Sequence, residues 1–131
     1  MSEYVPISEE LDLLARSVVD AALKVHRSLG PGLLESVYEI CLCHELSKRA
    51  IPFQRQLLLP VRYDGIRLDA GLRIDVLVAN CLVLELKAVD ELHPLHEAQV
   101  LTYLKLAEKR LGLLINFNVV LIKDGMKRIA L

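Results

Sequence analysis

The sequence has no apolar run of the ~18 residues that a membrane-spanning helix needs. Asn80, Glu85 and Lys87 interrupt the longest candidate. The N-terminal segment MSEYVPISEE is acidic and has no apolar stretch, so a signal peptide is not expected. Internal repeats, low-complexity tracts and linkers are also lacking. We therefore expect a cytoplasmic protein that is not bound to a membrane and forms a single domain over residues 1–131.

Cysteine is scarce, with Cys41, Cys43 and Cys81 as the only examples. The run Cys41-Leu42-Cys43-His44 has some likeness to a zinc-binding segment. On a helix, however, side chains two positions apart diverge by about 200°, so the two sulfurs cannot share a metal ion. Ordinary reduced thiols in the core are the expectation.

An excess of basic charge is missing too. The chain has 16 Lys and Arg against 17 Asp and Glu, which gives a net charge of −1. A protein that holds nucleic acid by itself usually carries a basic stripe, whereas the basic residues here are scattered along the sequence. This balance argues against strong nucleic-acid binding by an isolated chain. The 53% of hydrophobic residues exclude a disordered protein.

Hydrophobic periodicity predicts helices over residues 8–28, 33–49 and 94–110. Ser8 is the expected N-cap of the first, and Gly112 the stop of the third. Strands are predicted over residues 53–63, 66–68, 72–79, 81–87, 112–117, 119–122 and 126–131, with turns at Asp64-Gly65, Ala79-Asn80 and Asp124-Gly125. The predicted fold class is α+β (α/β/α-like), with helices against a central mixed sheet in the order ααβββαββ.

Two charges interrupt the apolar segment LVLELKAV at residues 82–89. In a strand, Glu85 and Lys87 point the same way, and desolvating them without a partner costs several kcal/mol by order of magnitude. Asp75 lies five residues before Asn80 and Glu85 five after, so a hairpin places both carboxylates on adjacent strands. Two such charges ~4 Å apart repel by about 4 kcal/mol at an effective dielectric near 20.

A divalent cation converts this repulsion into a binding site, because Mg²⁺ prefers one or two carboxylates and keeps waters for a substrate phosphate. Lys87 could then orient or deprotonate an attacking water, or stabilise charge on the phosphoryl oxygens. A simpler interpretation stays open, in which Glu85–Lys87 or Asp75–Arg73 forms an ion pair at the edge of the sheet.

His96, Gln99 and Tyr103 fall on one face of the third predicted helix. A glutamine and a tyrosine one turn apart suit hydrogen bonding to a phosphate backbone or support of metal ligands. Ordinary surface polarity is the alternative.

Glu35 and Tyr38, in the segment GPGLLESVY, share a face of the second predicted helix. Glu35 lies in the first turn, where the helix dipole favours a carboxylate whatever its function. His26 borders the apolar stripe of the first helix, so a hydrogen-bonded histidine at the edge of the core is the default interpretation.

The order of these groups resembles the PD-(D/E)XK nuclease superfamily: Glu35 on a helix, Asp75 on a strand, Glu85-Leu86-Lys87 on the next strand, and Gln99-Val100-Leu101-Thr102-Tyr103 on the following helix. The last motif looks like that of the RecB-like branch. More narrowly, Gly32 to Tyr38 matches the signature of the small GxxExxY proteins. The similarity extends over nearly the whole chain, including GLLINF at 112–117 and Arg128. One departure is Arg73-Ile74, where the superfamily name would put proline.

The resemblance implies a restriction-endonuclease-like core with Lys87 as the catalytic lysine and Asp75, Glu85 and Glu35 around a Mg²⁺ or Mn²⁺ ion. The resulting hypothesis is a metal-dependent nuclease that hydrolyses phosphodiester bonds of DNA. The residues expected to contact substrate are Gln99, Tyr103, His96, Tyr38, His26 and Arg73. The alternative hypothesis is a non-catalytic binding or accessory module, for which a homodimer or a protein partner supplies the missing basic surface.

Overall fold

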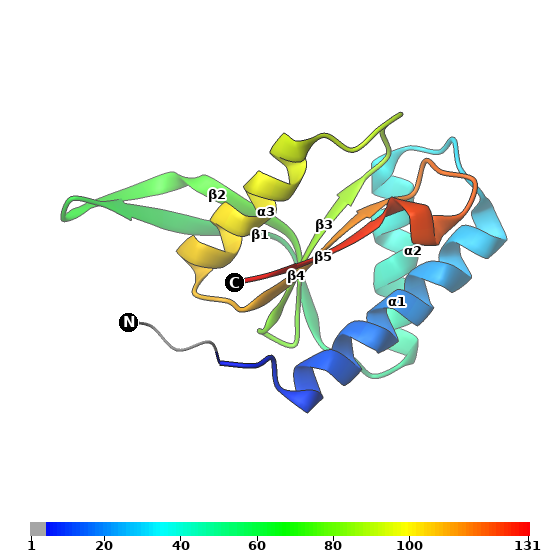
Figure 1. Cartoon of the computed structure of the whole chain (residues 1–131), viewed down its shortest axis with the longest axis horizontal. Coiled ribbons are helices and arrows are strands. Elements are labelled where there is room, and N and C mark those ends of the chain that lie inside the picture. The colour runs from blue at the N-terminus through cyan, green and yellow to red at the C-terminus, as the bar shows by residue number, and fades with distance from the viewer. Residues whose placement is uncertain (1–4) are drawn as a thin grey trace.

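A five-stranded mixed sheet forms the centre of the molecule in the computed structural model, which describes residues 5–131 (Figure 1). Residues 1–4 of the N-terminal segment discussed above lie outside the described part. The strands are β1 (Phe53–Tyr63), β2 (Ile66–Val78), β3 (Leu82–Lys87), β4 (Leu111–Asn116) and β5 (Met126–Ala130), and they lie side by side in this order. Only β3 and β4 run parallel; the other neighbouring strands are antiparallel.

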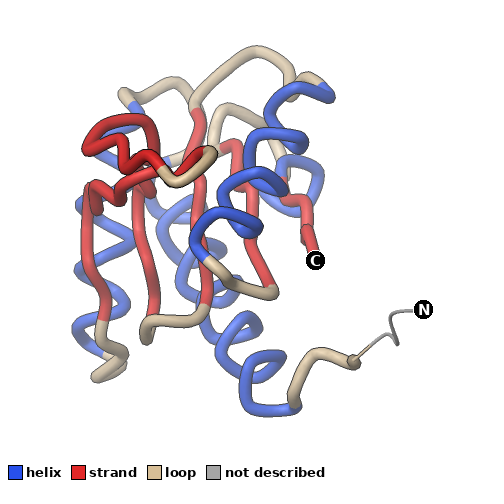
Figure 2. The backbone as a smooth tube through the Cα atoms, turned by 90° about the vertical axis from the view of Figure 1, so that its left-hand side faces the viewer, coloured by secondary structure: helices blue, strands red, loops and turns tan. Residues whose placement is uncertain are grey.

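Three helices cover the two faces of the sheet (Figure 2). They are α1 (Glu9–Leu29), α2 (Glu35–Lys48) and α3 (Pro94–Ala107), the last of which connects the parallel strands. The larger core cluster lies between the sheet and the pair α1 and α2. The smaller one includes Val100 and Leu104 of α3 with Leu77 and Val83 of the sheet. The predicted α/β/α-like fold with a mixed sheet is therefore confirmed.

Local signals explain where most elements begin and end. The Ser8 side chain accepts a hydrogen bond from the Leu11 N–H at 3.1 Å, as expected for an N-cap. Gly30 ends α1 with a φ of 71°, a conformation that glycine adopts without strain. Strand β2 is longer than predicted, because residues 66–68 and 72–78 belong to one continuous strand, which ends at Val78.

The prediction for the end of α3 was wrong. The helix ends at Ala107 because Glu108 adopts the left-handed conformation. Gly112 lies inside β4, where an added Cβ would approach Val100 Cγ1 to 2.8 Å. This glycine therefore allows α3 to pack closely on the sheet and does not stop the helix.

The strand predicted over residues 119–122, with a turn at Asp124-Gly125, was also wrong. A 3-10 helix, η1 (Ile122–Gly125), follows β4 by way of an irregular segment. One edge of β4 pairs with β3 and the other with β5, so no edge remains for another strand. Ile122 is buried against the sheet instead.

No helix within residues 5–131 is both long enough and apolar enough to span a bilayer. This agrees with the interrupted apolar runs of the sequence.

Candidate metal and catalytic site

The strands β2 and β3 separate where their carboxylates meet. Their backbone pairing extends from Val78↔Leu82 to Val76↔Leu84. At the next position, Asp75 and Glu85 replace the backbone bonds with side-chain bonds. The Asp75 N–H donates to Glu85 Oε1 at 3.3 Å, and the Leu86 N–H donates to Asp75 Oδ2 at 2.9 Å. The two carboxylates predicted to be neighbours are therefore fixed beside each other by reciprocal contacts.

Both carboxylates lie in a low-dielectric environment, since Asp75 and Glu85 are each only 4% exposed. Burial, followed by the negative charge of Asp75, raises the pKa of Glu85 to about 8. Among the ion pairs within residues 5–131, none includes Asp75, Glu85, Lys87 or Arg73. The simpler interpretation as a Glu85–Lys87 or Asp75–Arg73 ion pair is therefore not supported.

Lys87 lies on the same face of β3 as Glu85, two positions further along the strand. The charge of Lys87 affects the pKa values of three neighbouring groups. Its ammonium opposes the rise in the pKa of Glu85 and of Glu35, and it contributes to the lowered pKa of His96. The lysine therefore lies among the acids of β2, β3 and α2 without forming a direct ion pair with them.

The carboxyl of Glu35, an exposed residue, lies in the first turn of α2. Partial desolvation, followed by the charge of Asp75, raises the pKa of this carboxyl. Within residues 5–131, however, no three His, Cys, Asp or Glu side chains lie close enough together to hold one metal ion. Glu35 is therefore not part of such a group with Asp75 and Glu85, and its role as a metal ligand stays a prediction.

The helix α3 contributes the polar residues that the sequence predicted on one face. The Gln99 Nε2 donates to the Tyr103 hydroxyl at 3.1 Å. Burial, followed by the charge of Glu85, raises the pKa of Tyr103, which places its hydroxyl near the carboxylates. The charge of Arg73 opposes the rise in the pKa of Tyr103 and of Glu35, both of which burial raises.

His96 is held at the start of α3 by the preceding loop. Its Nδ1 accepts a hydrogen bond from the His93 N–H at 3.1 Å, so the neutral ring carries its proton on Nε2. Burial, followed by the charge of Lys87, lowers the pKa of His96. The ring therefore offers a hydrogen-bond donor near the lysine and no free basic nitrogen.

Two of the residues expected to contact substrate lie elsewhere. Tyr38 is fully buried and stacks on Phe117 with ring centroids 4.6 Å apart. Its hydroxyl donates to the Gly30 carbonyl at 2.6 Å and accepts from the Leu33 N–H at 3.1 Å. His26 is 7% exposed, and its Nε2 lies 2.7 Å from the Val119 carbonyl. Both side chains stabilise the loops around α1, and their assignment to substrate stays a prediction.

A buried network that the sequence analysis missed supports the site from the α2 side. Glu39 is 5% exposed and accepts hydrogen bonds from Arg55 Nε and Nη2 at 3.0 and 2.8 Å and from Gln56 Nε2 at 2.7 Å. Gln56 has a φ of 49°, and the pairing of β1 with β2 skips it between Arg55↔Val76 and Leu57↔Ile74. On β2, the residue left out of the pairing opposite Gln56 is Asp75. The only sequence signal was an acid with no assigned role on the inner side of α2.

The loop that follows β3 is tied to the end of β4. The Asn116 side chain accepts from the Val89 N–H at 3.1 Å and donates to the Val89 carbonyl at 2.9 Å. Because β3 and β4 are parallel, their ends meet at the same edge of the sheet, next to Lys87. This amide therefore fixes the backbone that carries the lysine.

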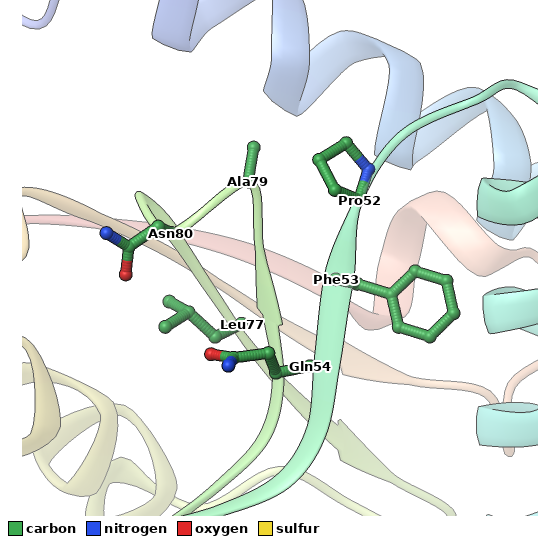
Figure 3. A pocket seen from close by; sticks show the side chains of 6 residues that line it. All are labelled: Pro52, Phe53, Gln54, Leu77, Ala79 and Asn80. Carbon is green, nitrogen blue, oxygen red and sulfur yellow. The ribbon is translucent and has the colours of Figure 1, made fainter.

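An open pocket lies elsewhere, at the β2–β3 turn (Figure 3). Its lining consists of Pro52, Phe53, Gln54, Leu77, Ala79 and Asn80, and its volume is about 530 Å³. Figure 3 shows Gln54 and Leu77 on one side of the strands and Phe53 on the other. None of the lining side chains is ionisable, so this pocket supplies no acid or base.

The sequence model of the PD-(D/E)XK nuclease superfamily matches residues 12–129. The chain belongs to this superfamily. Comparison with curated proteins found no match, and comparison with solved structures found none. The narrower resemblances to the GxxExxY proteins and the RecB-like branch remain predictions.

PD-(D/E)XK nucleases generally use divalent metals, and the residues present fit such an ion. Asp75 and Glu85 offer hard oxygen donors from two buried carboxylates, which Mg²⁺ and Mn²⁺ prefer. Burial, followed by repulsion from Asp75, raises the pKa of Glu85, and a bound cation would oppose both effects. The two buried carboxylates that would hold the ion are those of Asp75 and Glu85.

Proposed function

We propose that this PD-(D/E)XK domain, of the GxxExxY type, is a nuclease that hydrolyses phosphodiester bonds of DNA with the help of Mg²⁺ or Mn²⁺. Asp75 and Glu85 would hold the ion. The observation that carries the proposal is their reciprocal contact on diverging strands, with both side chains buried and with no ion-pair partner within residues 5–131. A purely structural role would not favour two buried like charges side by side.

When bound, the cation supplies Lewis acidity and lowers the pKa of a coordinated water. Lys87 lies beside the pair, and its ammonium can stabilise the charge that builds on the phosphoryl oxygens or orient the attacking water. Glu35 completes the negative rim. The Nε2–H of His96 can donate to a phosphate oxygen near Lys87.

Substrate would be positioned by α3 and β2. Gln99 and Tyr103 are joined by a hydrogen bond and border Glu85, so their remaining donors can hold a phosphate next to the carboxylates. Arg73 is exposed and near the same groups, and its guanidinium can form two bonds to one phosphate.

Nuclease assays with Mg²⁺ or Mn²⁺ on single- and double-stranded DNA and RNA test the proposal. We expect Glu85→Ala and Lys87→Ala each to lower the rate by at least about 100-fold, a typical loss for removing one electrostatic stabiliser. Glu91→Ala is a matched control, because Glu91 is exposed on the loop after β3. Equal activity in all variants, or no activity in the wild type on any of these substrates, would contradict the proposal.

The alternative is a non-catalytic nuclease-fold module that works with a protein partner or as a homodimer. The net charge of −1 favours it, since an isolated chain with this balance attracts phosphate weakly. Undetectable nucleic-acid binding at low salt, together with tight binding to a protein, would support this alternative over the nuclease.

A further inference from the structure

The β1–β2 hairpin projects beyond α3 and away from the rest of the molecule (Figure 1). The alternating positions of β1 that face α1 and α2 before Gln56 face α3 beyond it. Phe53 packs with the core cluster of α1 and α2. Regular alternation along β1 would put Leu57, Leu59 and Val61 on the same face as Phe53, but these three residues pack with the α3 cluster. The left-handed conformation of Gln56 lies between the two parts and explains the inversion.

This inversion gathers basic residues that are scattered in the sequence. Beyond Gln56, the apolar positions of β1 face α3, so the alternate positions form the opposite face. Arg62 pairs directly with Arg67, and Leu58 pairs with Arg73. All three arginines are exposed. The register of the two strands shifts by two residues between Leu59↔Leu72 and Val61↔Leu68. Because this shift is an even number of residues, strand alternation keeps the three arginines on the same, opposite face. We call these three arginines the arginine face.

The arrangement of the arginine face calls for an anionic partner. Like charges directly opposite each other on adjacent strands destabilise a hairpin, so Arg62 and Arg67 do not serve the fold. The face begins with Arg73, two residues before Asp75 on the same strand, and continues toward the hairpin tip. A polyanion held at the carboxylate pair would meet the arginines in succession.

We infer that the arginine face binds the phosphate backbone of the nucleic acid on one side of the scissile bond, an inference that rests on the proposed nuclease function. The arginine face concentrates basic charge on the β1–β2 hairpin, although the net charge of the whole chain does not suggest a basic surface.

The nearby acids do not cancel this surface. Asp69 bonds Arg67 at 3.1 Å, but both side chains are exposed, at 88% and 58%. A pair this exposed contributes little and yields readily to a phosphate. Asp64 lies in the turn at the hairpin tip.

The test measures binding separately from cleavage. A fluorescent 20-base-pair duplex DNA and the corresponding single strand are titrated, in EDTA and at several salt concentrations, with the wild-type chain and with the double variant Arg62→Ala/Arg67→Ala. The matched control, Arg16→Ala/Arg27→Ala, removes the same charge from exposed positions of α1. We expect the hairpin variant to bind about tenfold more weakly, with a salt slope smaller by about 1–2, and the control to match the wild type.

An equal loss in both double variants would mean that only total charge matters, and would overturn the inference. It would also be overturned if neither variant lost affinity, or if the wild type bound polyglutamate but no nucleic acid. The proposed nuclease function fails by a different result, namely wild-type binding without cleavage in the presence of Mg²⁺ or Mn²⁺. If the wild type cleaves DNA but its binding does not depend on the arginines, only the inference about the arginine face is overturned.

Discussion

At the scale of single residues, the acid Glu85 dominates the site. Its pKa is about 8 in the folded, metal-free chain, against an ordinary value of 4.5. Between these values the folded state binds more protons than the unfolded state, so the stability of the metal-free protein falls as the pH rises from about 5 to about 8. We expect Glu85→Gln to flatten this dependence and to raise the free energy of unfolding at pH 8 by about 1–3 kcal/mol.

Urea unfolding in EDTA across this pH range measures the effect. Glu91→Gln is the control, since Glu91 is exposed on the loop after β3. Parallel pH profiles for the wild type and Glu85→Gln would show that the acid is not crowded in solution.

The two tyrosines of the predicted site differ in role. The Tyr38 hydroxyl is bonded twice inside the molecule, to Gly30 and Leu33, whereas Tyr103 is half-buried beside the carboxylates. We expect Tyr38→Phe to lower the free energy of unfolding by about 1–3 kcal/mol and to leave KM unchanged. Tyr103→Phe should raise KM and change stability by less than about 1 kcal/mol. Thermal unfolding measures the effect of each variant on stability, and steady-state kinetics measure its effect on KM. A raised KM in Tyr38→Phe with a loss of stability in Tyr103→Phe would place Tyr38 at the substrate site.

At the scale of elements, the irregular pairing of β1 with β2 positions Asp75. Gln56 takes a left-handed conformation while its amide bonds Glu39. Glycine tolerates this conformation and a β-branched residue does not, so we expect Gln56→Val to be about 1–3 kcal/mol less stable than Gln56→Gly. The valine variant should also bind Mg²⁺ more weakly, as measured by calorimetry. Equal stability of the two variants would mean that the strand relaxes without moving Asp75.

The central hairpin could be predicted because its geometry is simple. Two strands joined by a tight turn pair symmetrically, and Val76↔Leu84, Leu77↔Val83 and Val78↔Leu82 are all symmetric about Asn80. The neighbouring carboxylates followed from this register alone. Polar spacing on one helix likewise predicted the contact between Gln99 and Tyr103.

Other features depended on partners that lie far away in the sequence. Residues 119–122 have the composition of a strand, but whether they pair depends on a free edge, and β5 occupies the available edge of β4. The role of Glu39 required knowing that α2 packs beside Arg55. A left-handed glutamine has no sequence signature, because glycine, asparagine and aspartate are the usual residues there.

At the scale of the whole molecule, the site depends on the layered arrangement. The parallel strands β3 and β4 end at one edge of the sheet, where Asn116 fixes the loop after Lys87. Helix α2 brings Glu35 to this edge from one layer, and α3 brings Tyr103 from the other. No single element holds enough polar groups for phosphodiester chemistry, so the groups assemble only when all three layers pack.

Metal binding should therefore stabilise the entire fold. An ion that binds only the folded chain adds about 2.7 kcal/mol when its concentration is 100 times Kd. Because the Glu85 carboxyl must lose its proton first, this stabilisation should be larger at pH 8 than at pH 6. We expect calorimetry to show a Mg²⁺-dependent rise in Tm that Asp75→Asn and Glu85→Gln abolish and that Asp90→Asn, at an exposed acid after β3, retains. A Mg²⁺-dependent rise in Tm that persists in both site variants would place the ion elsewhere. A rise in Tm that becomes larger as the pH falls would exclude competition between the ion and the proton of the Glu85 carboxyl.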